Sequence, residues 1–146
     1  MTEIGFYHLT RSTLAQALPR LLARTLAAGQ RALVFGSSAA GLEALSTALW
    51  TQSGWLPHGL TSDGDPDLQP IWLSTMAEPL NGARYLFMVD GAETDRIKDY
   101  DRVFDLFDGN SPETVAAARV RWKNAKDAGH SLAYWQQTES SWQKKA

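Results

Sequence analysis

The sequence predicts an α/β protein of one domain, with a mostly parallel sheet flanked by helices. Short apolar runs alternate with amphipathic stretches over the first fifty residues, and this order is typical of βαβ units with right-handed crossovers. The chain has 146 residues, and a globule of about 150 residues hides roughly 68–70% of the surface that its unfolded chain exposes. One hydrophobic core therefore suffices without covalent crosslinks.

The first strand and the first helix are expected within residues 4–26. Residues 4–9 are aromatic and β-prone, and residues 10–13 offer helix caps before apolar residues that recur at helical spacing. Gly29 marks the end of this helix because glycine readily adopts the left-handed conformation that follows many helices.

A second strand and a second helix follow. Residues 32–35 form a short apolar run of the kind that a parallel sheet buries. A helix is expected over residues 39–50, capped by Ser37 or Ser38. Residues 51–70 are then rich in Gly, Pro, Asp and Ser, and they are too long for an ordinary connection in a compact domain. Loops of this kind often carry function.

The second half of the chain repeats the alternation. The expected elements are strands at residues 71–74 and 85–89, a short helix and a strand within residues 96–108, and a helix over residues 112–127. Residues 131–135 predict an edge strand, and residues 136–146 predict a polar, frayed segment. We therefore expect a domain over residues 1–136 and a polar C-terminal tail over residues 137–146.

Composition excludes several classes of function. The chain contains no cysteine, which excludes disulfides, iron–sulfur clusters, thiolate zinc sites and a cysteine nucleophile. No segment has the roughly 20 apolar residues that span a bilayer, and the N-terminal residues lack the features of a signal peptide. The net charge of −2 disfavours binding of nucleic acid through the overall field. We expect a cytoplasmic protein without membrane contact.

The segment from Gly36 to Gly41 lies where a phosphate-binding loop would lie, between a strand and a helix. It has the glycine spacing of a P-loop. Leu42 and Glu43 stand where the phosphate-binding lysine and the magnesium-binding hydroxyl would be, and the carboxylate of Glu43 would repel a phosphate. A plain capped turn is the favoured interpretation, without a functional nucleotide site.

Catalytic chemistry has little support in the sequence. His8, His58 and His130 lie far apart and lack further ligands at helical spacing, so we expect no metal site. No nucleophile motif joins Ser, His and Asp. The carboxylates of residues 90–108 are interpreted as solvated surface; they are Asp90, Glu93, Asp95, Asp99, Asp101, Asp105 and Asp108. We expect a protein without a catalytic site or a cofactor.

The last helix carries a basic stripe. Helical spacing places Val115, Arg119, Trp122, Lys123 and Lys126 on one side of it, and no acidic residue lies between Thr114 and Asp127. A guanidinium can hold a carboxylate in a bidentate fork, and an indole offers an apolar wall, so this stripe fits an acidic peptide with an aromatic end. The alternative is an ordinary solvated basic face.

A second candidate surface contains two tryptophans. Trp50 ends the second helix, and Trp55, Leu56, Pro57 and His58 follow in the long loop. Two tryptophans beside glycine and proline are difficult to bury completely in a loop, so part of this surface is expected to contact a partner. The alternative is that the loop folds back as a lid on the core.

These residues, together with others, resemble the chi subunit of bacterial DNA polymerase III. The matching motifs are Phe6-Tyr7-His8-Leu9, Glu43-Ala44-Leu45, Ala48-Leu49-Trp50, Leu56-Pro57-His58-Gly59-Leu60, Pro70-Ile71-Trp72-Leu73, Phe104-Asp105, Arg119-Val120-Arg121-Trp122-Lys123 and Ala128-Gly129-His130. Their order and spacing extend over residues 4–136. The resemblance implies a Rossmann-like fold that has lost cofactor binding, and an accessory subunit rather than an enzyme.

The resemblance also implies two partners. Members of the family bind the psi subunit, which tethers them to the clamp loader, and the acidic C-terminal tail of single-stranded DNA-binding protein (SSB). By position, the tail site resembles Arg119, Trp122, Lys123 and Lys126 with Gly129 close by, and contact with DNA would be indirect. The psi-binding surface resembles the second surface, which consists of Trp50, Trp55, Leu56, Pro57 and His58.

Two details differ from the family pattern. Val115 stands where some members carry a basic residue, and Trp55 replaces another aromatic ring. Two alternative functions remain at this point: a nucleotide- or phosphate-binding enzyme on a Rossmann-like fold, and direct binding of single-stranded DNA by the basic stripe with stacking on Trp122.

Overall fold

One eight-stranded sheet forms the centre of the computed structural model, which describes residues 2–51, 56–60, 63–138 and 141–146. The strands are β1 (Glu3–Leu9), β2 (Ala32–Phe35), β3 (Gly59–Leu60), β4 (Ile71–Ser74), β5 (Tyr85–Met88), β6 (Arg102–Asp108), β7 (Ser131–Gln137) and β8 (Trp142–Lys144). Their spatial order is β3-β4-β2-β5-β6-β1-β7-β8. Every neighbouring pair is parallel except β7 and β8, which are antiparallel. The expected α/β class and mostly parallel sheet are confirmed.

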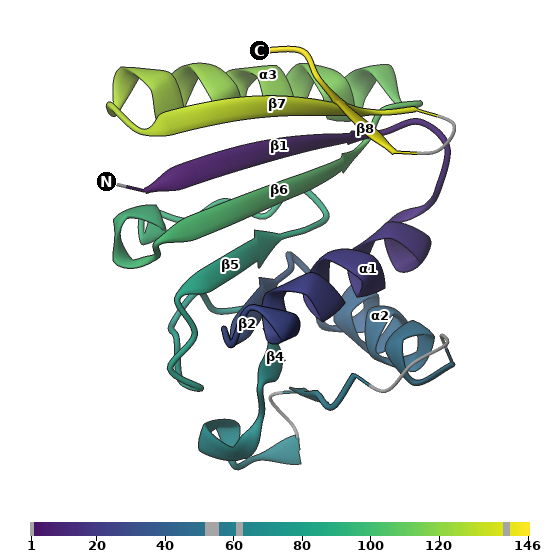
Figure 1. Ribbon diagram of the computed structural model, residues 1–146, viewed down its shortest axis with the longest axis vertical. Coiled ribbons are helices and arrows are strands. Elements are labelled where there is room, and N and C mark those ends of the chain that lie inside the picture. Colours follow the sequence, from purple (N-terminus) through teal and green to yellow (C-terminus); the bar gives the residue numbers. More distant parts are fainter. Residues whose placement is uncertain (1, 52–55, 61–62, 139–140) are drawn as a thin grey trace.

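Three α-helices cover the two faces of this sheet. They are α1 (Leu14–Ala27), α2 (Ala39–Thr51) and α3 (Pro112–Asp127), and short 3-10 helices span Pro66–Leu68 and Ile97–Asp99. Figure 1 shows α1 and α2 together over the part of the sheet around β5 and β2, whereas α3 runs beside β7 and β1. Side chains alternate between the faces along a strand: Tyr7 packs with α1 and α2, and Phe6 packs with α3.

Helix boundaries follow from capping chemistry. Thr13 caps α1 with its side chain, and Gln16 bonds back to the Thr13 backbone N–H, so the two form a capping box. Ser111 caps α3 and Pro112 begins it, where a missing N–H has no cost. Ser38 Oγ accepts a hydrogen bond from the Gly41 N–H at the start of α2. The predicted starts of all three helices are therefore confirmed.

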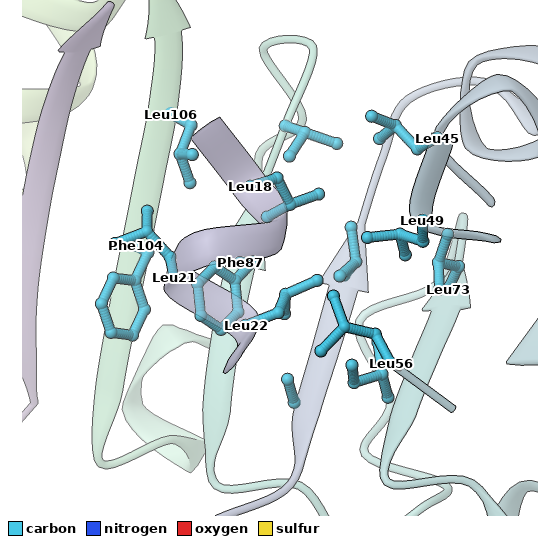
Figure 2. Close-up of a cluster of buried hydrophobic side chains, with 14 of the residues drawn as sticks. Leu18, Leu21, Leu22, Leu45, Leu49, Leu56, Leu73, Phe87, Phe104 and Leu106 are labelled. Carbon is cyan, nitrogen blue, oxygen red and sulfur yellow. The ribbon is translucent and has the colours of Figure 1, made fainter. Parts of the chain in front are cut away.

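One of the two hydrophobic clusters of the core lies under α1 and α2. Figure 2 shows Leu18, Leu21 and Leu22 of α1 meeting side chains of α2 and of the central strands. Phe87 of β5 and Phe104 of β6 stack with ring centroids 4.3 Å apart. Burying a leucine or phenylalanine side chain stabilises a protein by about 1.5–3 kcal/mol, so these contacts hold both helices on this face.

A charged pair is buried beneath α3. Arg121 of α3 donates from Nε to Asp105 Oδ2 at 2.6 Å and from Nη2 to Oδ1 at 3.0 Å. The two side chains are only 7% and 2% exposed. Burial raises the pKa of the Asp105 carboxyl, and the hydrogen bonds and charge of Arg121 act in the opposite direction. Such a pair contributes orientation more than net stability, because desolvation offsets its attraction.

Four details differ from the sequence-based predictions. Asp105 is not solvated surface, because its side chain pairs with Arg121 in the core. Residues 131–135 are not an edge strand, since β7 lies between β1 and β8. Residues 142–144 are not frayed: they form β8, and Trp142 packs against the ring of Tyr7 at 5.1 Å. The long loop contains the two-residue strand β3.

The buried pair predicts an unequal response to mutation. Asp105→Ala leaves the Arg121 guanidinium buried without its partner, and the free energy of unfolding should fall by about 3–5 kcal/mol. Urea unfolding followed by far-UV circular dichroism measures this loss. As a control, Asp101→Ala removes the exposed pair of Asp101 with Arg84 and should leave the unfolding midpoint almost unchanged. Equal losses in the two variants would contradict the role assigned to Asp105.

Candidate protein-binding surfaces

The basic stripe predicted on the last helix lies on the solvent side of α3. Arg119, Lys123 and Lys126 are exposed, and Val115 is half-buried against the core. Within the part of the chain that the structure describes, the three cations of the stripe form no salt bridge with an acidic side chain. Their charges are therefore available to an acidic ligand.

Trp122 joins this stripe to the sheet. Its ring is half-buried and meets Phe6 of β1 edge-on, with centroids 5.2 Å apart. It also meets Tyr134 of β7 edge-on at 5.8 Å. These contacts fix the indole as one wall of the surface, so a bound side chain would meet an ordered ring and the cost of immobilising it would be small.

Gly129 lies directly after α3 with a φ of 84°. The Gly129 N–H donates to the Lys126 carbonyl, and the His130 N–H donates to the Ala125 carbonyl, the pattern of a helix end that needs a left-handed residue. Gly129 is exposed, so its role at this surface is to turn the chain from α3 into β7 close to Lys126.

Sequence reasoning did not assign Tyr134 or His8 to this surface, although Tyr134 contacts Trp122 and His8 contacts Tyr134. Tyr134 Oη lies 2.6 Å from His8 Nδ1. Burial raises the pKa of Tyr134, while the positive charge of Arg119 acts in the opposite direction. The β pairing aligns Tyr134 with Phe6, and only this long-range pairing brings the hydroxyl to α3. The one sequence signal was a tyrosine in an apolar run.

In the second predicted surface, the Trp50 side chain is exposed, whereas the His58 ring that it rests on is buried. Trp50 is 57% exposed at the end of α2, and its ring lies 4.1 Å, centroid to centroid, from the buried ring of His58. His58 Nδ1 donates to the Leu56 carbonyl at 2.8 Å, and Ser46 Oγ donates to Nε2 at 2.9 Å. The Leu56 carbonyl can only accept a hydrogen bond, so neutral His58 carries its proton on Nδ1 and accepts from Ser46 at Nε2. His58 therefore holds the underside of Trp50.

The other members of that surface have different positions. Leu56 belongs to the core under α1 and α2, and Pro57 is half-buried. The alternative of a loop that folds back as a lid is therefore confirmed for Leu56 and His58. Trp55 lies outside the described residues. Of the described residues of α2, Trp50 is the exposed large hydrophobic side chain.

The turn after β2 disfavours a phosphate. Ser37 Oγ donates to the Asp90 carbonyl at 3.1 Å, and a Cβ placed on Gly41 would lie 2.9 Å from Asp90 Oδ2. The Asp90 carboxylate thus occupies the space over the turn in which a phosphate would be bound, and it would repel that anion.

A cavity of about 770 Å³ lies at the carboxyl ends of β1 and β6. The chain leaves these neighbouring strands toward opposite faces, into α1 and α3, which makes this the position where open α/β sheets hold their ligands. Asp90, Asp108 and Glu113 line it together with Arg11 and Arg121, and Arg121 is already paired with Asp105. Carboxylates therefore outnumber the cations in this lining, which disfavours a nucleotide there as well.

In the ranges that the structure describes, no group of three or more His, Cys, Asp or Glu side chains is arranged to hold a metal ion. No helix formed by those residues is long and apolar enough to cross a membrane.

The sequence of this chain is also similar to proteins of a known family. The family model described as "DNA polymerase III chi subunit, HolC" matches residues 1–133. A relative from Rickettsia prowazekii (strain Madrid E), described as "Probable DNA polymerase III subunit chi", is 27% identical over 109 residues. The alignment covers 71% of this chain and 66% of the relative, so the chain spans just under two thirds of the relative's length. The family match includes both α3 and Trp50.

The support beneath Trp50 leads to a prediction. Ser46→Ala leaves His58 Nε2 buried without a donor, and the free energy of unfolding should fall by about 1–3 kcal/mol. Thr47→Ala is the matched control, because the Thr47 hydroxyl is exposed and bonds only to the Glu43 carbonyl of its own helix. Thermal unfolding of both variants measures the difference. A loss no greater for Ser46→Ala than for Thr47→Ala would contradict the supporting role of His58.

Proposed function

Since this chain belongs to the DNA polymerase III chi subunit family, we propose that it is a non-catalytic adaptor of DNA replication. It links the clamp loader, through the psi subunit, to the acidic C-terminal tail of SSB. The observation that carries this proposal is the row of exposed, unpaired cations on α3 beside the ordered indole of Trp122. An acidic peptide with an aromatic end has the complementary chemistry.

The proposed tail site divides the ligand into two parts. Arg119 holds the terminal carboxylate, because its guanidinium forms two parallel hydrogen bonds with a carboxylate. Lys123 and Lys126 attract the acidic residues that precede the terminus, and Trp122 supplies an apolar wall for the last side chain. Exposed charges dominate this encounter, so added salt weakens it. Val115 leaves one end of the stripe without a further charge.

The proposed psi-binding surface is centred on Trp50. Exposed tryptophans that rest on an ordered support are typical interface hot spots, and the His58 ring supports this one. Leu56 and His58 act from beneath, because their side chains are buried. Pro57 and Trp55 complete the proposed surface.

The adaptor gains overall affinity because it has two separate binding sites. Each tail contact is weak, but a clamp loader that meets several tails gains through effective concentration. Contact with DNA is then indirect, through SSB. The cytoplasm, where bacterial DNA is replicated, is the proposed location.

The alternative functions have less support. A nucleotide- or phosphate-binding enzyme would need an anion site, and carboxylates line both the turn after β2 and the cavity at the carboxyl ends of β1 and β6. Direct binding of single-stranded DNA would need several exposed aromatic faces on which successive bases stack, whereas the stripe offers one partial wall, the half-buried ring of Trp122.

The tail site makes one prediction for binding. Arg119→Ala should weaken binding of a labelled acidic peptide that ends in phenylalanine by at least about tenfold, because charge-assisted hydrogen bonds to the carboxylate are lost. Fluorescence anisotropy at low and moderate salt measures the affinity. Arg20→Ala is the control, since Arg20 is also an exposed cation but lies on α1. No binding by the unmodified protein, or equal loss in both variants, would exclude this site.

The psi-binding surface makes the complementary prediction. Trp50→Ala should weaken binding of the psi subunit by about 2 kcal/mol or more, as expected for a hot spot, while peptide binding at α3 stays unchanged. Leu68→Ala is the control, since Leu68 is an exposed apolar side chain on the Pro66–Leu68 turn. Isothermal titration calorimetry measures both interactions. If Trp50→Ala and Arg119→Ala each removed both interactions, the two-site proposal would fail.

A further inference from the structure

The stripe on α3 continues onto β7 through Tyr134. The Tyr134 ring packs edge-on against Trp122 at an interplanar angle of 73°. The charge of Arg119 acts on the Tyr134 hydroxyl and opposes the rise in its pKa that burial causes. Because Trp122 is the wall that would meet the last side chain of a peptide held by Arg119, the Tyr134 ring borders the same proposed site. Tyr134 is also fixed through its backbone, since its N–H and its carbonyl both bond to the last two residues of the chain.

The direction of the Tyr134 hydroxyl depends on His8. His8 Nε2 lies 3.3 Å from the Gly109 carbonyl, which only accepts, so the proton of the neutral imidazole belongs on Nε2. His8 Nδ1 is then an acceptor, and the Tyr134 hydroxyl, 2.6 Å away, donates to it. In this state Tyr134 directs its proton inward and offers only lone pairs to a ligand.

Protonation of His8 reverses this hydrogen bond. Both imidazole nitrogens then carry a proton, so Nδ1 donates to the Tyr134 oxygen. The Tyr134 proton is released from the inward bond and can point toward the surface. The surface thereby gains a hydrogen-bond donor beside Trp122, on the side of the stripe where the proposed carboxylate would bind.

We propose that Tyr134 is a ligand-binding residue of the α3 surface and that His8 sets, through its proton, whether Tyr134 can donate to a bound carboxylate. The inference rests on the proposed binding of an acidic C-terminal tail and adds a pH-dependent contact to that site. Binding of the tail and uptake of a proton by His8 become linked, so each strengthens the other.

The groups that face His8 and Tyr134 are compatible with this change of hydrogen-bond direction. β7 contributes Tyr134, and β6 contributes the Phe107 ring, 5.1 Å from His8. Arg119 is the charged group of α3 that acts on Tyr134. Asp105 and Arg121 lie on the same face but neutralise each other. A Cβ on Gly109 would lie 1.9 Å from the His8 ring, so glycine at this position allows the imidazole to reach the carbonyl.

Two variants separate this switch from a purely structural role, because they have opposite expected effects. Tyr134→Phe keeps the ring that packs on Trp122 but removes the donor, so peptide affinity should stay low at every pH. His8→Leu keeps an apolar side chain of similar size and removes the inward acceptor, so Tyr134 can donate outward at every pH and affinity should stay high.

The experiment is a titration of the labelled acidic peptide by anisotropy, from about pH 7.5 to about pH 6, where imidazole changes its charge. In the unmodified protein the affinity should rise by about two- to tenfold, the value of one added hydrogen bond. Both variants should lose this pH response, Tyr134→Phe at the weak limit and His8→Leu at the tight limit. His130→Gln is the control, because His130 is the half-buried histidine that follows Gly129, and it should keep the response.

Each outcome has a distinct meaning. A pH response that persists in Tyr134→Phe, or weak binding by both variants, overturns the switch while the tail site stands. A response that disappears in His130→Gln assigns the proton to His130 and also overturns it. Absence of peptide binding by the unmodified protein at all pH values removes the proposed function and this inference together. As a second readout, imidazole ¹H–¹⁵N spectra should show neutral His8 protonated on Nε2, and a proton on Nδ1 would contradict the proposal.

Discussion

The buried pair between Asp105 and Arg121 determines how α3 lies on the sheet. Arg121 is 8% exposed, and its two hydrogen bonds to Asp105 admit little rotation of the helix. Ala118 and Ala125, on the same side of α3, are small enough for close approach to β1 and β6. Once this side is fixed, helical geometry directs Arg119, Lys123 and Lys126 to solvent. The orientation of the proposed tail site thus depends on one ion pair.

The two proposed surfaces lie on opposite faces of one rigid sheet. Trp50 is near the end of α2, which contacts β3 and β4. The basic stripe lies on α3, which runs beside β7 (Figure 1). An adaptor gains from this separation, since both partners can bind without competing for space. The parallel strands between them are buried on both sides and provide a stiff connection.

Much of the fold was predictable from local patterns. The starts of α1, α2 and α3 follow from their caps, and the apolar runs of β2 and β4 match the strands residue for residue. β8 was missed because Trp142–Lys144 is short and polar, and only pairing with β7 makes it a strand. Asp105 was misassigned because its partner, Arg121, is 16 residues away on another element. Sequence patterns report neighbours along the chain and along one helix, not contacts between elements.

The sequence by itself determined the α/β class, the helix boundaries and the concentration of cations on one helix, because periodicity and capping act over a few residues. The tertiary structure decided which side chains of each segment reach solvent. It buried Leu56 and His58 while leaving Trp50 exposed, and it brought Tyr134, with His8 bonded to it, against Trp122 of the stripe. The physical reason is that burial and hydrogen-bond partners are set by the packing of distant strands and helices, and hydrophobic patterns within one segment do not encode that packing.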